Sequence, residues 1–282
     1  MLGRTLRQAN PFFLIAGPCV IESKDIVLQI AHSLQEIGKE LEIPVIFKAS
    51  FDKANRQDIA SFRGPGLEVG LDILQQVKQE TGLPILTDVH ETCQVEAVGN
   101  VVDIVQIPAY LCRQTDLLVA AAKTGKLVNI KKGQMCSPET MLLAAKKVTT
   151  TTQHQDVILT DRGTMFGYGD LVVDPRNIPK LGQQGAMVVQ DVTHSVQRTG
   201  SSLSSNGDRE YIPTIARMAA AGKISLFSKD LILVVGVDGF FIETHPNPQQ
   251  GLSDSTTMLP LAELRPLLQE LIAISQASKA RG

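Results

Sequence analysis

The chain has 282 residues, with 27 Lys and Arg against 29 Asp and Glu, so its formal net charge is −2. A hydrophobic content of 43% with so small a net charge excludes an intrinsically disordered chain, and the lack of a basic excess argues against a dedicated nucleic-acid binder. The length suits either two small domains or one (β/α)8 barrel, which takes about 250 residues.

Short apolar runs rich in Val and Ile alternate along the whole chain with longer segments of helical period. The runs predict eight strands, at Phe12–Gly17, Pro44–Ser50, Pro84–Val89, Ile104–Ala109, Leu127–Lys132, Asp156–Asp161, Ala186–Val192 and a last one that ends at Glu243. The segments between them predict helices at Lys24–Leu41, Leu67–Thr81, Glu91–Gly99, Asp116–Lys123, Pro138–Val148, more weakly Pro179–Gln183, Arg209–Ala221 and Leu259–Ser278.

Strands that are apolar along nearly their whole length are buried on both faces, which is typical of a parallel sheet. Eight strand–helix units without a linker between them predict an α/β fold, a single-domain (β/α)8 TIM barrel over residues 1–282. An open, doubly wound sheet is the alternative. Residues 222–235 interrupt the last unit and are predicted to be an insertion, in which Leu231–Val235 either forms its own strand or extends the next one.

Basic side chains gather where the predicted strands end. In a barrel of this kind, the carboxyl ends of the strands build the active site. Cations concentrated at one mouth of a slightly acidic protein favour an anionic substrate, held by Arg forks and Lys charges. The alternative, that each is a solvated loop residue, weakens as their number grows. The residues are Lys48, Lys53, Arg56, Lys131, Lys132, Arg162 and, in a following loop, Arg113.

A second group has the chemistry of metal ligands. Cys19, His194 and Glu243 follow or end strands that become neighbours only if the barrel closes, and Asp254 can reach them from the last loop. A thiolate, an imidazole and carboxylates suit one divalent ion such as Zn, Fe, Mn or Co. Taken singly, Cys19 also fits a small buried apolar residue, and His194 a hydrogen-bonded core histidine.

Lys131 ends a central strand, so an imine-forming lysine of a Schiff-base aldolase is a further interpretation. Lys132 and Arg162 favour an anion clamp at this place instead, because they make the surroundings cationic rather than apolar.

The four cysteines, Cys19, Cys93, Cys112 and Cys136, are too few and too scattered for a disulfide framework. No apolar run approaches the roughly 18 residues of a membrane span. We therefore expect a cytoplasmic protein with reduced thiols and with neither a membrane nor a nucleic acid as partner.

The motifs of the chain closely resemble the family of 3-deoxy-D-manno-octulosonate 8-phosphate (KDO 8-phosphate) synthases, relatives of the DAHP synthases. The resemblance covers about Pro11 to Leu261. It rests on Leu14-Ile-Ala-Gly-Pro-Cys-Val-Ile-Glu-Ser23, Phe47-Lys-Ala-Ser-Phe-Asp-Lys-Ala-Asn-Arg56, Phe62-Arg-Gly-Pro-Gly66, Thr87-Asp-Val-His90, Gln106-Ile-Pro-Ala109, Arg113-Gln-Thr-Asp116, Asn129-Ile-Lys-Lys-Gly-Gln134, Arg162-Gly-Thr-Met-Phe-Gly-Tyr168, Asp191-Val-Thr-His-Ser195 and Glu243-Thr-His-Pro246.

The resemblance implies a homotetrameric transferase of lipopolysaccharide biosynthesis that condenses phosphoenolpyruvate with arabinose 5-phosphate and water. By the same resemblance, Asn55 and Arg56 bind the pentose phosphate, Arg113 reaches into a neighbouring subunit's site, and Asp88 and His90 line the reacting region. The implied phosphoenolpyruvate site is Lys48, Lys53, Gln106, Lys131 and Arg162, and the implied catalytic residues are Lys48, Asp88, His90 and His194.

The family has a metal-independent form with Asn at one position and a metal-dependent form with Cys there. This chain has Cys19 at that position, with His194, Glu243 and Asp254 as the matching ligands. The resemblance therefore implies one divalent metal ion.

Three features depart from the family pattern. Asp161 stands where Glu is expected, and this shorter side chain would loosen the placement of Arg162. The loop Arg198–Arg209 lacks the expected Ser-Gly-Gly motif. Residues 222–235 would displace Glu243 if they disturbed the last strand. Two other functions therefore stay open: a related synthase that uses another sugar phosphate, such as erythrose 4-phosphate, and a non-catalytic barrel that binds anionic sugars.

Overall fold

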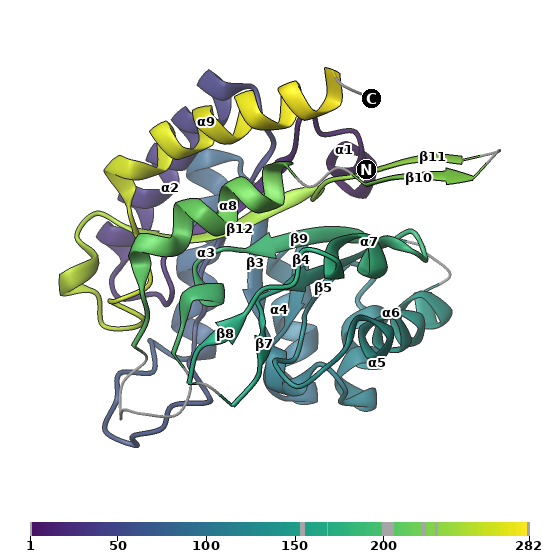
Figure 1. Ribbon diagram of the computed structural model, residues 1–282. Helices are drawn as coiled ribbons and strands as arrows, with labels where there is room; N and C mark the ends of the chain where they lie inside the picture. Colours follow the sequence, from purple (N-terminus) through teal and green to yellow (C-terminus); the bar gives the residue numbers. More distant parts are fainter. Residues whose placement is uncertain are drawn as a thin grey trace.

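Eight parallel strands form a closed barrel in the computed structural model, which describes residues 2–152, 156–167, 169–198, 206–221, 224–228 and 231–280 (Figure 1). Each strand pairs with the next, and pairing of the first with the last closes the ring. The strands are β1 (Phe13–Gly17), β2 (Val45–Lys48), β3 (Ile85–Asp88), β4 (Ile104–Ile107), β5 (Leu127–Lys131), β6 (Val157–Asp161), β9 (Met187–Asp191) and β12 (Gly239–His245). The predicted single-domain TIM barrel is confirmed, and the open sheet is ruled out.

Helices follow the strands and surround the barrel (Figure 1). They are α2 (Lys24–Leu41), α3 (Leu67–Thr81), α4 (Val95–Val101), α5 (Thr115–Lys123), α6 (Pro138–Thr152), α7 (Asn177–Gly182), α8 (Ile212–Ala221) and α9 (Leu261–Ala280). Short 3₁₀ turns and strands complete the loops: η1 (Thr92–Gln94), η2 (Ala109–Leu111), η3 (His194–Val196), η4 (Arg209–Tyr211), η5 (Pro248–Gln250), β7 (Thr164–Met165), β8 (Leu171–Val172) and β13 (Leu259–Pro260). No helix in the described ranges has both the length and the apolar character needed to cross a bilayer.

Local signals in the sequence set the helix ends. The hydroxyl of Ser23 accepts a hydrogen bond from the backbone N–H of Ile26 at 3.3 Å, which caps the first turn of α2. Gly82 ends α3 in a left-handed conformation that residues with a side chain adopt at a cost.

Alternate residues of each strand pack into two separate cores. One set, including Leu14, Val105 and Ile130, faces the helices, while the other, including Ile15, Ile46 and Leu86, fills the barrel interior. Side chains two positions apart in a strand point to the same face. The residues two positions beyond Ile46 and Leu86 are Lys48 and Asp88, so the interior changes from apolar to charged toward the carboxyl ends.

The amino-terminal end of the barrel is covered by α1 (Leu2–Arg7), which the sequence pattern did not predict. Leu6 is buried in the interior core, and Leu2 packs against the same core. Arg7 Nε lies 2.6 Å from Asp156 Oδ1, just before β6, so an ion pair joins the helix to the barrel.

The interrupting segment forms a hairpin of its own, in which β10 (Ile224–Ser228) pairs antiparallel with β11 (Leu231–Val235). Leu231–Val235 is thus a separate strand and does not extend β12. The register of β12 against β1 places Glu243 opposite Gly17, so the segment does not displace Glu243. That the segment is an insertion stays a prediction.

The role of α1 predicts a large effect of Leu6→Ala on stability. Removing this buried side chain leaves a cavity under the barrel and should lower the free energy of unfolding by about 2–5 kcal/mol. The same truncation at Leu143, which is 64% exposed on α6, should cost less than about 0.5 kcal/mol. Denaturant unfolding of both variants measures this, and equal losses would show that α1 contributes no more than a surface residue.

Candidate active site

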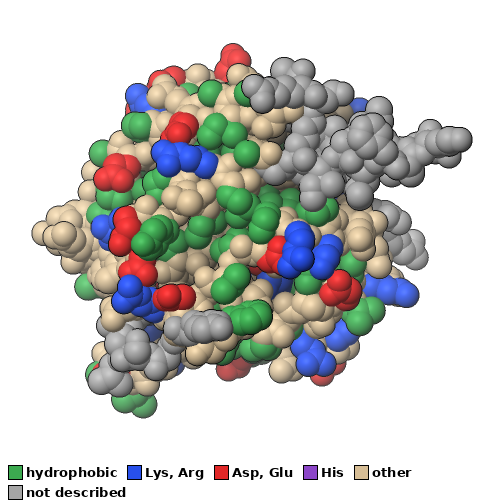
Figure 2. Space-filling view, in the orientation of Figure 1, with side chains coloured by type: hydrophobic (Ala, Val, Ile, Leu, Met, Phe, Trp, Pro, Cys, Tyr) green, Lys and Arg blue, Asp and Glu red, His purple; other side chains and the backbone are tan. Residues whose placement is uncertain are grey.

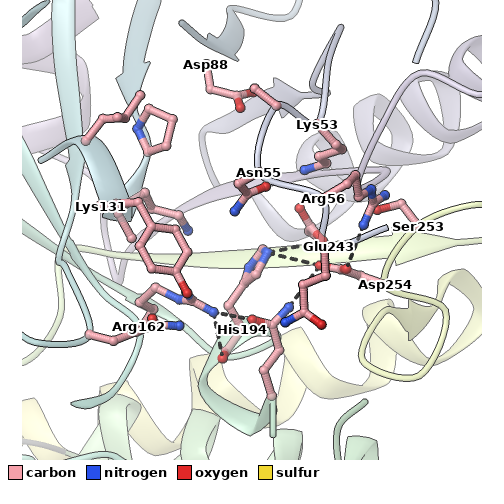
Figure 3. Close-up of a pocket in the computed structure, with 18 of the residues that line it drawn as sticks. Lys53, Asn55, Arg56, Asp88, Lys131, Arg162, His194, Glu243, Ser253 and Asp254 are labelled. Atoms are coloured by element: carbon pink, nitrogen blue, oxygen red, sulfur yellow. Dashed lines mark hydrogen bonds and ion pairs between the residues drawn. The ribbon is translucent and has the colours of Figure 1, made fainter. Parts of the chain in front are cut away.

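A cavity of about 990 Å³ opens at the carboxyl ends of the strands. Twelve of the side chains that the sequence singles out line it, and Figure 3 shows Lys53, Asn55 and Arg56 facing Lys131 and Arg162 across the cavity, with His194 between. The lining residues of this set are Lys48, Lys53, Asn55, Arg56, Asp88, His90, Gln106, Lys131, Arg162, His194, Glu243 and Asp254.

Two buried ion pairs form the floor of the cavity. Lys48 Nζ lies 2.6 Å from Glu243 Oε1 and also donates to the carbonyl of Cys19 at 2.8 Å. Lys131 Nζ donates to Asp191 Oδ2 and stands 3.3 Å from the centroid of the Phe241 ring. Burial lowers the pKa of Lys131 to about 8, although Asp191 acts in the opposite direction.

His194 is held in place by Asp191. The backbone N–H of His194 donates to Asp191 Oδ1 at 2.9 Å, and His194 Nδ1 lies 2.7 Å from Asp191 Oδ2. Burial acts to lower the pKa of His194, but the carboxylates of Asp191 and Glu243 outweigh it and raise this pKa. This contact directs Nε2 away from Asp191, 3.6 Å from Glu243 Oε2 and 3.5 Å from Asp254 Oδ2 (Figure 3).

Cys19, Glu243 and Asp254 form a group able to hold a metal ion. The Cys19 thiol and one carboxylate oxygen of each acid all lie within 4.8 Å of one another. Glu243 Oε2 is buried and has no hydrogen-bond partner, and a cation would satisfy it. Burial and the charges of Asp254 and Glu243 raise the pKa of Cys19, so the thiolate also needs a cation beside it. The thiolate and carboxylates therefore fit a divalent ion, and His194 Nε2 borders the same space.

Asp88 and His90 form a second acid–base pair, at the carboxyl end of β3. His90 Nε2 lies 3.0 Å from Asp88 Oδ2, while Asp88 Oδ1 and His90 Nδ1 are buried without a hydrogen-bond partner. Burial acts against both charges, but the hydrogen bond and the opposite charge of the partner lower the pKa of Asp88 and raise that of His90. The pair thus leaves one acceptor and one ring nitrogen for a ligand.

The loop between β2 and α3 supplies the cations of the opposite wall. Lys53 Nζ donates to Ser50 Oγ at 3.1 Å, and Arg56 Nε donates to the carbonyl of Phe62 at 3.1 Å. Arg56 Nη1 lies 3.8 Å from Asp254 Oδ1. Burial opposes the charge on Lys53, but Cys19 and Glu243 outweigh it and raise the pKa of Lys53, which keeps this side chain cationic.

Gln197 joins the basic and acidic parts of the cavity. Its Oε1 accepts from Arg162 Nη2, and its Nε2 donates to Asp254 Oδ2 at 2.9 Å. Sequence reasoning missed this residue, because an amide in a loop gives no signal of long-range contacts. It also missed Ser253, whose hydroxyl lies 2.8 Å from the Cys19 thiol, and Phe241 beneath Lys131.

Gln106 is oriented by a relay inside the barrel. Asn129 Nδ2 donates to Gln106 Oε1 at 2.9 Å, and Thr160 Oγ1 donates to Asn129 Oδ1 at 2.7 Å. Since its oxygen is engaged in this relay, the amide nitrogen of Gln106 is the group oriented for a ligand.

Two expectations about side chains need correction. Lys132 is not at the mouth: it is fully buried, and its Nζ donates to the carbonyl of Gly163 at 2.9 Å. Asp161 does not loosen Arg162, because it accepts from the backbone N–H of Gly163 at 3.0 Å and from Asn177 Nδ2 at 3.1 Å, while Arg162 is held by Gln197. Both side chains therefore anchor the loop after β6.

Arg113 is exposed beside α5 and does not line the cavity of its own chain. Of the loop Arg198–Arg209, residues 199–205 lie outside the described part of the chain, as does Tyr168. On the face drawn in Figure 2, acidic and basic side chains are interspersed with hydrophobic ones. The cations that line the cavity are Lys48, Lys53, Arg56, Lys131 and Arg162.

Comparison with known proteins places the chain in a family. Residues 6–279 match the model of the DAHP synthetase I family. The chain is 50% identical to a 2-dehydro-3-deoxyphosphooctonate aldolase of Pisum sativum, over all of this chain and 94% of the relative. It is 48% identical to a protein of the same name from Syntrophotalea carbinolica, over 96% of this chain and 93% of the relative. The closed barrel, its cationic cavity and these matches agree: the chain belongs to the DAHP synthetase I family.

Proposed function

We propose that this chain is a transferase that condenses phosphoenolpyruvate with D-arabinose 5-phosphate and water, giving 3-deoxy-D-manno-octulosonate 8-phosphate and inorganic phosphate. The observation that carries the proposal is the cavity, in which cationic side chains lie beside Glu243 and Asp254, with the buried Cys19 thiol next to these two acids. The relatives' name, 2-dehydro-3-deoxyphosphooctonate aldolase, supports the same eight-carbon product.

Phosphoenolpyruvate carries a carboxylate and a phosphate, and the inner part of the cavity offers a cation for each. Lys131 and Arg162 are buried there, and Lys48 stands beside them. Lys53 and the amide of Gln106 complete the proposed site. Charges held in a buried cavity act more strongly than charges in water, so this arrangement positions the enol phosphate for reaction.

Asn55 and Arg56, on the outer loop, are proposed to bind the phosphate of the pentose. The segment Lys53-Ala-Asn-Arg56 separates this chain from synthases that use erythrose 4-phosphate, in which a Lys-Pro-Arg-Thr type of sequence is expected. The placement of Arg56 within 3.8 Å of Asp254 sets the pentose site directly beside the acidic group.

The reaction forms one carbon–carbon bond and breaks one carbon–oxygen bond. C3 of the enol phosphate attacks the aldehyde carbon, water adds to the cationic C2, and phosphate leaves with its bridging oxygen. Lys48 and Arg162 stabilise the negative charge that develops on the new alkoxide and on the leaving phosphate. His90, whose pKa Asp88 raises, can supply a proton to the new alkoxide, and Asp88 Oδ1, which has no hydrogen-bond partner, can orient the attacking water by accepting a hydrogen bond from it.

A divalent ion, Zn, Fe, Mn or Co, fits the group of Cys19, His194, Glu243 and Asp254. When bound, it would supply Lewis acidity or a template for the aldehyde. His194 is positioned for this role, since its Nδ1 lies 2.7 Å from Asp191 Oδ2 and its Nε2 faces the two acids.

From the family resemblance we also propose a homotetramer in which Arg113, which is exposed and lies outside the cavity of its own chain, completes a neighbouring subunit's active site. We also propose the cytoplasm as the compartment and lipopolysaccharide synthesis as the use of the product, both from the family resemblance.

The first test is phosphate release from phosphoenolpyruvate with arabinose 5-phosphate or erythrose 4-phosphate, with and without a chelator. We expect release with arabinose 5-phosphate, its loss on chelation, and its return with a divalent ion. Activity with erythrose 4-phosphate alone would contradict the proposed acceptor. If folded protein supplied with metal releases no phosphate with any acceptor, the result would favour a non-catalytic barrel.

Cys19→Ala tests the metal site separately from turnover. Removing the thiolate should weaken binding of the divalent ion at least tenfold, since one of four proposed ligands is lost. Cys93→Ala is the matched control, because that thiol is exposed and away from the cavity. Metal content after dialysis measures both variants, and unchanged stoichiometry in Cys19→Ala would refute the ligand assignment.

Hybrid tetramers test Arg113. The Arg113→Ala and Lys131→Ala variants should each lose most of the activity. Mixed tetramers that contain both variants can be isolated by giving each variant a different affinity tag. These hybrids should be at least tenfold more active than either parent. In the hybrid, a chain with Lys131 receives Arg113 from its neighbour. A hybrid of two differently tagged Arg113→Ala chains is the control, and hybrids no more active than the parents would exclude a role in the neighbouring site.

A further inference from the structure

Three sulfur atoms gather at one place that the proposed reaction does not use. Cys112 follows η2 after β4, and Cys136 lies in the turn between β5 and α6. Their thiols are buried, with 1% and 5% of the residues exposed, and the two Sγ atoms are 3.8 Å apart. Two loops from neighbouring strands thus bring two free thiols into contact.

The third sulfur belongs to Met135. A β-carbon built on Gly133 would lie 2.9 Å from Cys136 Sγ and 3.0 Å from both Cys112 Sγ and Met135 Sδ. The three sulfurs therefore cluster against the α-carbon of Gly133, at a place that only a glycine leaves open to them. Met135 is 61% exposed, so its thioether closes the site on the solvent side.

The spacing of the thiols suits two ligands of one ion. With metal–sulfur bonds of about 2.3 Å, two sulfurs on one ion lie about 3.8–4.0 Å apart at tetrahedral or trigonal angles. A disulfide would require about 2.05 Å instead. The observed 3.8 Å is an ordinary thiol–thiol contact that also falls within the first range, so the two sulfurs can bind one ion without moving apart.

The ligand types select the ion. Among the described residues, no further His, Cys, Asp or Glu joins the two thiols within ligand distance, so the third donor is a thioether. Thiolate and thioether donors together favour the soft ion Cu(I), whereas Zn(II) takes a fourth ligand and prefers thiolate, imidazole or carboxylate.

The surroundings keep the Cys112 thiol protonated when no ion is bound, so an ion must displace its proton on binding. Burial and Cys136 raise the pKa of Cys112 to about 11, while the backbone of Gly133 and the charge of Arg113 act in the opposite direction. Lys132 Nζ lies 3.4 Å from the carbonyl oxygens of Gly133 and Cys136 and 3.4 Å from Asp161 Oδ1, so this paired cation holds the turn that carries Cys136 in place.

We propose that Cys112, Cys136 and Met135 form a second metal site, distinct from the Cys19 group, that binds one Cu(I) ion through three sulfurs. The site is joined to the active site through Gln134, which lies in the same turn and lines the catalytic cavity.

The test uses the full-length Cys19→Ser/Cys93→Ser variant, which keeps only this pair of thiols, titrated anaerobically with Cu(I) against a chromophoric chelator. We expect one equivalent of Cu(I) to be withheld from the chelator, and X-ray absorption to find sulfur ligands only. Adding Cys112→Ser or Cys136→Ser should abolish that equivalent, while adding Met135→Leu should weaken it about tenfold.

Circular dichroism shows whether each variant is folded, and Met135→Leu, at an exposed position, remains informative if a buried Cys→Ser change disrupts folding. Retention of Cu(I) by folded Cys112→Ser, or full affinity in Met135→Leu, would overturn the three-sulfur site. Binding of Zn(II) but not Cu(I) would overturn the choice of ion.

Discussion

The site depends on the hydrogen-bonded pairing of β1 with β12. This pairing closes the barrel and sets Gly17 opposite Glu243, so that Cys19, two residues beyond β1, comes next to an acid more than two hundred positions away. On its other side, β1 approaches β2 so closely that a glycine is needed: a β-carbon on Gly17 would lie 1.9 Å from the carbonyl oxygen of Lys48. Any larger residue would push β2 away and move Lys48 with it.

Charge balance inside the closed barrel is the second constraint. A buried unpaired charge is costly, and the floor meets this cost by pairing Lys48 with Glu243 and Lys131 with Asp191. Each of these carboxylates has a second role besides pairing with a lysine: Asp191 also orients His194, and Glu243 also faces the proposed metal position. Cations and metal ligands are therefore parts of one electrostatic unit, and changing any of these carboxylates should affect both.

Much of this arrangement is readable from the sequence, because the signals are local or follow from barrel closure. Apolar runs with polar residues at their carboxyl ends predict the eight strands and place Lys48, Asp88 and Glu243 at the same mouth. What could not be predicted depends on packing between distant segments. The sequence before Pro11 gives no sign that Leu6 fills the barrel, and nothing local distinguishes Lys132, which anchors a loop, from Lys131, which lines the cavity.

Ser253 and Gln197 show the same limit at the site itself. Both are polar loop residues whose positions become meaningful only when the loops fold over the barrel and reach Cys19 and Asp254. The residue types of a site can thus be inferred from strand ends, while the residues that hold them in place require the structure.

The most direct test of the central claim, that barrel closure assembles a single-thiolate metal site, is X-ray absorption on the chain loaded with one equivalent of Zn(II). The account predicts one sulfur neighbour at about 2.3 Å, with nitrogen and oxygen completing the coordination. A spectrum with no sulfur neighbour, or with two or more, would contradict it.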